Sequence, residues 1–153
     1  MILDIEFTRL YSEERGMPFE IYKAYMKPII DDAFGWDEEF QRNGFESNLD
    51  PDWFSWVLAE DKGKTKKAGL TCSRYKRRSL HIHLLVVFAE EQKKGIGTSV
   101  VKKLKAQAYA ENTRLTLNCF KNNVPALNLY RNLGFVINSE DEHFYRFICK
   151  KQS

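Results

Sequence analysis

The sequence predicts an α/β fold with a mixed, mostly antiparallel central sheet flanked by helices on both faces. Three observations indicate it. Alternating segments separated by turns occupy residues 53–88, a helical pattern of apolar residues follows over 96–108, and another alternating segment spans 114–120. A meander of antiparallel strands that continues into a strand–helix–strand crossover produces such a mixed sheet.

The first third of the chain is expected to add one strand and two helices. Residues 2–10 alternate loosely as a strand, and the acidic segment 12–14 suggests a helix start that Gly16 and Pro18 interrupt. Residues 19–30 carry a helical apolar stripe, in which Pro28 predicts a kink or a boundary. A break at 35–37 precedes a shorter helix over 38–45.

The remaining elements follow from turn and capping residues. Strands are predicted over 53–60, 67–75 and 79–88, with turns at 62–64 and 76–78. A short helix is expected within 122–135, because Asn123 suits its start, Pro125 its first turn and Gly134 its end. Residues 143–150 alternate as a closing strand.

Length and composition predict one domain over residues 1–153. The length fits the range of about 100–200 residues for a domain, and 43% hydrophobic with 29% charged residues is typical of a soluble globular protein. The longest apolar run, 84–89, is far shorter than the about 20 residues that cross a bilayer. No secretion signal is visible, so we expect a cytoplasmic protein without a membrane partner.

The cysteines and the basic stretch of the chain are two further candidate functional features. Cys72, Cys119 and Cys149 lack metal-site spacing and predict reduced, packed thiols, and no zinc site is expected. The basic stretch 62–78 could touch nucleic acid. Because lysines commonly keep hairpin turns soluble, we expect no nucleic-acid partner.

The most informative stretch is residues 92–98, between a predicted strand and a predicted helix. Gly95 and Gly97 let backbone N–H groups converge at the helix start, where the helix dipole also favours an anion. Lys93 and Lys94 add positive charge, and Thr98 adds a hydroxyl. The spacing matches neither a Walker A loop nor a dinucleotide fingerprint. These residues suit phosphate binding, and the alternative is a glycine-bearing turn with solvated lysines.

The order strand, Gln-x-x-Gly-x-Gly, helix, strand, Asn-x-x-Ala-x-x-x-Tyr-x-x-x-Gly-Phe resembles the GNAT superfamily of acetyl-CoA-dependent N-acetyltransferases. The resemblance covers residues 79–148. It implies the GNAT fold, acetyl-CoA as the cofactor and an amine as the acceptor. Lys93 and Ala89 depart from the family pattern, because a small residue and a proline are common at these positions.

The resemblance also implies the residues that bind the cofactor. The pyrophosphate would lie on the loop formed by Gln92, Lys93, Lys94, Gly95, Ile96, Gly97 and Thr98. The main chain of Leu85, Val86 and Val87 would pair with the pantetheine arm, with the Val87 N–H facing the thioester carbonyl. Asn123 and Tyr130 would also contact the coenzyme.

Acetyl transfer needs an acid for the departing thiolate and a base for the amine. Tyr130 matches the family acid, and a phenol with a pKa near 10 carries its proton at neutral pH; the alternative is a core tyrosine. His81 and His83 share one face of the predicted strand and are the candidate bases, against the alternative of packed or surface histidines.

The acceptor is sought in the first third of the chain. Trp36, Asp37, Glu38 and Glu39 combine an aromatic plane with carboxylates, which suits a cationic amine; the alternative is a helix start with favourable acids. We therefore expect acetyl transfer, within a ternary complex, to the primary amine of a small cationic molecule. A protein or peptide acceptor and a noncatalytic acyl-CoA-binding module are the alternatives, and the oligomeric state, a homodimer included, stays open.

Overall fold

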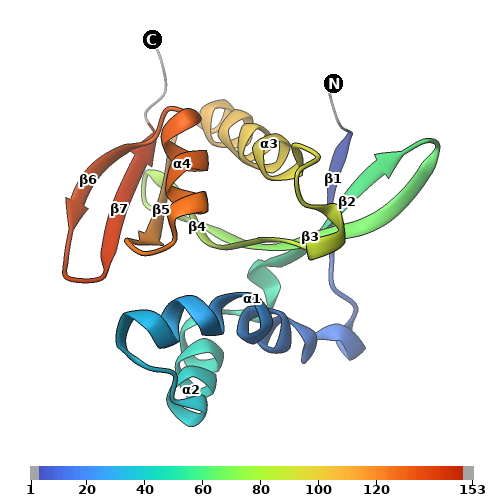
Figure 1. The fold of residues 1–153 in the computed structure, drawn as a ribbon. Helices are drawn as coiled ribbons and strands as arrows, with labels where there is room; N and C mark the ends of the chain where they lie inside the picture. The colour runs from blue at the N-terminus through green and yellow to red at the C-terminus, as the bar shows by residue number, and fades with distance from the viewer. Residues whose placement is uncertain (1–3, 150–153) are drawn as a thin grey trace.

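The computed structural model describes residues 4–149, and these form one mixed seven-stranded sheet (Figure 1). The strands are β1 (Ile5–Arg9), β2 (Phe54–Asp61), β3 (Lys64–Lys76), β4 (Ser79–Val87), β5 (Arg114–Phe120), β6 (Val136–Glu140) and β7 (Phe144–Cys149). Their order across the sheet is β1-β2-β3-β4-β5-β7-β6. Only β4 and β5 pair in parallel among these strands, because α3 connects them as a crossover.

Two pairs of helices cover opposite faces of the sheet (Figure 1). Helices α1 (Met17–Phe34) and α2 (Glu38–Asn48) lie on one face, and α3 (Ile96–Ala110) and α4 (Val124–Asn132) lie on the other. Short 3₁₀ turns occur at Ser12–Glu14, Pro51–Trp53 and Ala89–Glu91. The predicted fold class is therefore confirmed.

Each face of the sheet has its own hydrophobic core. The larger core joins the sheet to the buried stripe of α3, whose members are Ile96, Val100, Val101, Leu104 and Ala108. The smaller core packs β2, β3 and the end of β4 against α1 and α2. β4 contributes to both cores, and its side chains must therefore change face along its length.

A bulge in β4 makes this change of face. Cys72 of β3 lies opposite Leu84, whereas the next residue, Ser73, lies opposite Ile82. His83 is therefore the extra residue, and side chains beyond it point to the face opposite the one that simple alternation would give.

The core memberships agree with this change. Before the bulge, Leu80 and Ile82 pack in the α3 core. After it, Leu84 and Val86 pack in the core beneath α1.

Three elements differ from the sequence predictions. α1 continues through Pro28, which lies in an exposed turn of the helix, so the predicted boundary there is wrong. β6 was not predicted, because all of its residues are exposed and leave no alternating pattern. The predicted first strand includes residues 2 and 3, and the predicted last strand includes residue 150. These three residues lie outside the described range, and β1 and β7 occupy most of the remaining positions.

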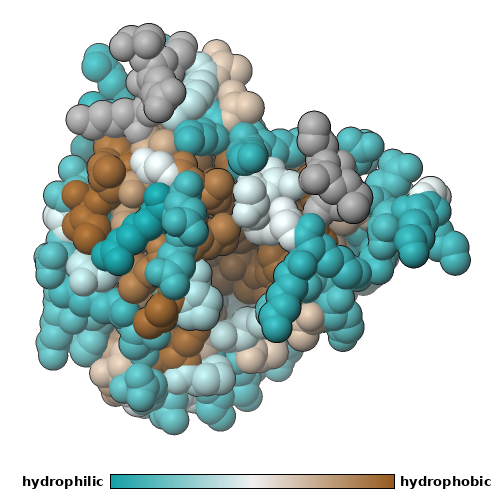
Figure 2. Space-filling model, turned by 45° about the horizontal axis from the view of Figure 1, so that its top comes forward, coloured by the Kyte–Doolittle hydropathy of each residue, from teal (hydrophilic) through white to brown (hydrophobic). Residues whose placement is uncertain are grey.

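The basic stretch 62–78 extends from the projecting β2–β3 hairpin to the β3–β4 turn. Figure 2 shows the hairpin covered by hydrophilic residues, as expected for a soluble turn. Lys67 pairs with Glu14 at 2.7 Å, and Lys66 pairs with Glu91. No helix in residues 4–149 is long and apolar enough to cross a membrane.

Candidate active site

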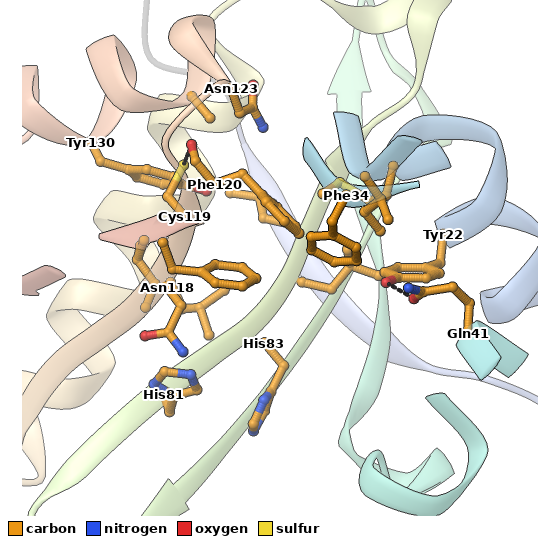
Figure 3. A pocket seen from close by; sticks show the side chains of 18 residues that line it. Tyr22, Phe34, Gln41, His81, His83, Asn118, Cys119, Phe120, Asn123 and Tyr130 are labelled. Carbon is orange, nitrogen blue, oxygen red and sulfur yellow. Dashed lines mark hydrogen bonds between the residues drawn. The ribbon is translucent and has the colours of Figure 1, made fainter. Parts of the chain in front are cut away.

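The site is a cavity of about 330 Å³ at the point where β4 and β5 separate. The two strands pair only from Ser79 opposite Arg114 to Ile82 opposite Leu117. Beyond that point their facing backbone groups have no partner strand. Helix α1 covers the opening, and Figure 3 shows side chains from β4, β5, α1 and α4 converging on it.

The open edge of β4 presents backbone groups toward this gap. The Phe88 N–H donates to the Ala68 carbonyl of β3 at 2.8 Å. Backbone N–H and C=O groups alternate in direction along an antiparallel ladder. Those of Val86 therefore point toward β3, and those of Leu85 and Val87 point away from it. The Val87 carbonyl accepts from Gln92 Nε2 at 3.0 Å, so its N–H is the group directed to the gap.

The loop after β4 leads into α3 in the predicted order of strand, glycine turn and helix, and two of its residues are left-handed. Gly95 adopts φ 82° and Lys93 adopts φ 66°, both left-handed, immediately before α3 begins at Ile96. Lys93 is therefore strained where a glycine would not be.

Lys94 donates a hydrogen bond to the buried side chain of Glu91. Hydrogen bonds from Lys66 and then from Lys94 hold the Glu91 pKa below its usual value.

Gly97 permits close packing at the start of α3, whereas Gly95 permits a left-handed backbone. A Cβ atom at Gly97 would lie 3.5 Å from Leu129 Cδ2 and 3.7 Å from Val87 Cγ2. These are ordinary contacts, so position 97 has space for a methyl group but not for more. The residue lets α3 begin close to α4 and β4.

We expect Gly97→Ala to keep coenzyme affinity and Gly97→Val to weaken it, because the larger side chain displaces the start of α3 from Leu129. Calorimetric titration with coenzyme A measures both variants, and the alanine variant is the matched control. Equal affinities for the valine variant and the unmodified protein would show that α3 does not form the phosphate site.

Tyr130 and Asn123 line the cavity from the α4 side (Figure 3). The Tyr130 side chain packs on Phe135 and Phe147 and is 8% exposed. Burial raises its pKa well above the usual value, so the phenol holds its proton throughout the neutral range. Asn123 precedes α4 without capping it by its side chain, which leaves the amide available to a ligand.

His81 and His83 lie together at the other side of the cavity, on the α1 face of β4. Their ring centroids are 4.6 Å apart, and His81 Nδ1 lies 2.8 Å from Thr116 Oγ1. Burial, followed by the charges of Arg74 and Lys76, lowers the His81 pKa. Burial, followed by the charges of His81, Arg74 and Lys76, lowers the His83 pKa to about 4, so His83 is a weak base.

The acidic segment predicted to bind the acceptor lies away from the cavity wall. Asp37 caps α2 by accepting from the Phe40 N–H, and Glu38 pairs with Lys23 at 2.9 Å. Trp36 donates its indole N–H to Glu38. Glu39 is exposed, and none of residues 36–39 lines the cavity.

Several lining residues were not identified from the sequence, among them Tyr22, Phe34, Gln41, Asn118 and Phe120. Tyr22 donates to Gln41 at 2.8 Å across α1 and α2 (Figure 3). The apolar stripe of α1 signalled burial against the sheet but not which part of the sheet it covers. Thr116, beside His81, follows only from the register of β4 on β5.

Thiol and metal chemistry receive no support from this site. Cys72, Cys119 and Cys149 are free and buried, and burial raises the Cys119 pKa to about 12. A thiol with so high a pKa is a poor nucleophile. Within residues 4–149, no cluster of His, Cys, Asp and Glu has the arrangement of a metal site.

Solved structures share this fold over nearly the whole chain. PaiA N-acetyltransferase from Thermoplasma acidophilum, in complex with coenzyme A, is 16% identical, with TM-score 0.66 and coverage of 97% of this chain and 99% of that one. A Bacillus subtilis acetyltransferase in complex with CoA is 15% identical, with TM-score 0.65 and coverage of 98% and 99%. The NatC complex bound to Gag peptide and CoA is 18% identical, with TM-score 0.56 and coverage of 97% and 99%.

This chain therefore shares its fold with acetyltransferases that were solved in complex with coenzyme A. Residues 9–135 match the model of the acetyltransferase (GNAT) family. The chain therefore belongs to the GNAT family and is an acetyl-CoA-dependent N-acetyltransferase. No curated protein matches its sequence.

Acetyl-CoA should stabilise the fold measurably, because a ligand that binds only the folded state adds its binding free energy. At 100 times the dissociation constant the gain is about 2.7 kcal/mol, which corresponds to a melting shift of roughly 5–10 °C for a chain of this size. Differential scanning fluorimetry measures the shift, with NAD as the control ligand. No shift with acetyl-CoA, or an equal one with NAD, would contradict the cofactor site.

Proposed function

We propose that the protein transfers an acetyl group directly from acetyl-CoA to a primary amine while both are bound, with Tyr130 as general acid and His81 as general base. The observation that carries the proposal is that these two side chains line one cavity, beside the unpaired backbone of β4. A donor and an acceptor that share a cavity need no covalent intermediate on the protein. The raised pKa of Cys119, the cysteine in that wall, agrees with this.

The residues of the chain supply the remaining chemistry. Acetyl-CoA supplies the activated acetyl group, and the loop at 92–98, the open edge of β4 and Asn123 are the groups that would hold it. The Val87 N–H donates to the acetyl oxygen, where negative charge develops. Tyr130 donates its phenolic proton to the departing sulfur.

His81 removes a proton from the amine. For Nε2 to accept this proton, Nδ1 must carry the ring hydrogen and donate it to Thr116 Oγ1, at the 2.8 Å distance observed. His83 packs its ring against His81 and helps to position it. The lowered pKa of His81 keeps its ring neutral at neutral pH, the form in which it acts as a base.

Two of the carboxylates that suggested a cationic acceptor already have partners within the protein. The carboxylates of Asp37 and Glu38 already cap α2 and pair with Lys23. The acceptor is therefore proposed to be a primary amine that receives the acetyl group directly. Residues 36–39 are not proposed to recognise a further positive charge on it. A peptide amine is a second candidate, favoured by the fold likeness to the NatC complex bound to Gag peptide.

A panel of small amines and short peptides, each assayed for acetyl-CoA-dependent release of free thiol, tests the function. Acetylated amine identified by mass spectrometry, in an amount equal to the thiol released, is the expected result. Initial rates should depend on both substrates in an intersecting pattern. Binding of acetyl-CoA with no amine-dependent thiol release would instead favour a noncatalytic acyl-CoA-binding module.

A further inference from the structure

A second cavity, of about 620 Å³, meets the first at the two histidines. His81 and His83 line both cavities. The second is otherwise dominated by basic residues from the end of β3, the following turn and the start of β5. We call it the basic cavity, and its cationic residues are Arg74, Lys76, Arg77, Arg78 and Arg114.

The cations of the basic cavity have no acidic partner among the residues that the structure describes. Within residues 4–149, none of them lies within 4.0 Å of a carboxylate oxygen, although other basic residues do. The contrast is clear along β3 itself, where Lys66 and Lys67 pair with Glu91 and Glu14. Like charges gathered without counter-charges repel one another, and a bound anion would relieve that repulsion.

Stacked rings hold one of these cations in place. The Arg74 guanidinium carbon lies 4.4 Å from the centre of the Trp53 ring, and Trp53 stacks on His83 with centroids 5.5 Å apart. In the described part of the chain, Arg74 Nε and His83 Nε2 are the only buried side-chain nitrogen or oxygen atoms without a hydrogen-bond partner. Polar groups are therefore fixed and unsatisfied where the two cavities meet.

The basic cavity is separate from the phosphate-binding loop of the coenzyme. It lies at the Ser79 end of β4, whereas the loop at 92–98 follows the Val87 end. At ~3.3 Å per residue, the nine residues of β4 place these ends about 25 Å apart. An anion in the basic cavity would therefore be carried by the acceptor.

We propose that the acceptor is a small amine that also carries a phosphate or carboxylate group, with its amine at His81 and its anionic group in the basic cavity. This inference rests on the proposed function. Arginine side chains suit both anions, because the planar guanidinium donates pairs of hydrogen bonds to them. The cavity volume lies in the range of about 300–1,000 Å³ typical of small-molecule sites.

The positive charges of the basic cavity also act on His81, the proposed base, so a bound anion would change the pKa of its imidazole. Burial is the main cause of the lowered pKa of His81, and the charges of Arg74 and Lys76 add to it. An anion bound between these residues counteracts their charges at the imidazole. The acceptor's own anionic group thus strengthens the base that deprotonates its amine.

Matched amines test the proposal. O-phosphoethanolamine is compared with ethanolamine, and β-alanine with β-alaninamide, by kcat/KM for thiol release; the two pairs separate phosphate from carboxylate recognition. We expect at least one anionic member to exceed its neutral partner by tenfold or more. In the Arg78→Gln/Arg114→Gln double variant, the ratio of kcat/KM for the anionic amine to kcat/KM for its neutral partner should fall at least tenfold. The cause should be a higher KM for the anionic amine.

The Lys62→Gln/Lys64→Gln double variant is the control, since it removes the same charge at the far end of β3 and should leave the ratio unchanged. Ratios near one for both amine pairs, or equal losses in the two double variants, overturn the anionic acceptor while leaving the acetyltransferase function intact. Inhibition of the reaction by tRNA but not by O-phosphoethanolamine analogues would overturn it in favour of a nucleic acid.

A binding measurement separates this inference from the proposed function. Calorimetry of O-phosphoethanolamine with the complex of protein and coenzyme A should show binding that weakens at least tenfold in the Arg78→Gln/Arg114→Gln variant. If no amine releases thiol, the proposed function fails. If neither O-phosphoethanolamine nor β-alanine, measured in the same way, binds to this complex, the anion site is overturned by itself.

Discussion

Replacing Tyr130 with phenylalanine should lower kcat by roughly 10²–10⁴, the usual contribution of general acid catalysis. The substitution removes one hydroxyl from a side chain packed on Phe135 and Phe147, so the ring contacts and the fold should survive. KM for acetyl-CoA should change little. Steady-state kinetics with one good amine acceptor, and fluorimetry with acetyl-CoA, measure the two effects.

Tyr145→Phe is the matched control, because Tyr145 of β7 packs against the same hydrophobic core as Tyr130 but does not line the cavity. It should retain full activity. If Tyr130→Phe matched this control in kcat, Tyr130 would be a core residue and another donor would protonate the thiolate. A loss of acetyl-CoA binding in Tyr130→Phe would mean that the hydroxyl binds the coenzyme and does not act as the acid.

His81→Gln should lower kcat/KM for the amine by roughly 10² at pH 7, because glutamine cannot accept the amine proton. In the unmodified protein the rate should fall as pH drops through the pKa of His81, since protonation removes the base. That pKa lies below its usual 6.5, so the acidic limb should lie below pH 6.5. His81→Gln should lose this limb.

His83→Gln and Thr116→Val distinguish the base from its supports. His83→Gln should keep the acidic limb, because the pKa of His83, about 4, makes it a weak base. Thr116→Val removes the hydroxyl that holds His81 Nδ1 and should reduce the rate by less than His81→Gln does. If His81→Gln kept the limb and His83→Gln lost it, the two roles would be reversed.

Local patterns predicted most of the fold. The strand at 114–120 and the start of α3 at Ile96 follow from alternation and from the glycine turn, and both appear as expected. The edge strand β6 left no pattern because no side chain in it is buried. Pro28 does not end α1, because the contacts of neighbouring α1 residues with the sheet outweigh the hydrogen bond that the proline loses.

The candidate site could be predicted only where it is local in sequence. Asn123 and Tyr130 stand in a recognisable spacing and line the cavity between β4 and β5, and the loop at 92–98 connects β4 to α3. The basic cavity was not foreseen, because Arg114 joins the β3–β4 turn only through the parallel pairing of Ser79 with Arg114. Such pairings depend on residues distant in the chain.

The extra residue at His83 gives β4 two segments that are out of phase with each other. Substituting residues within either segment preserves the phase, so this strand has freedom to vary in composition. Deleting His83 would remove the bulge and restore regular alternation, which leaves Leu84 and Val86 facing the core beneath α1 but removes the local bend that a bulge gives the strand. A change in the length of β4 at His83 therefore alters the bend of the strand beside the cavity and not its core contacts, which constrains how acceptor specificity in this protein can be redesigned.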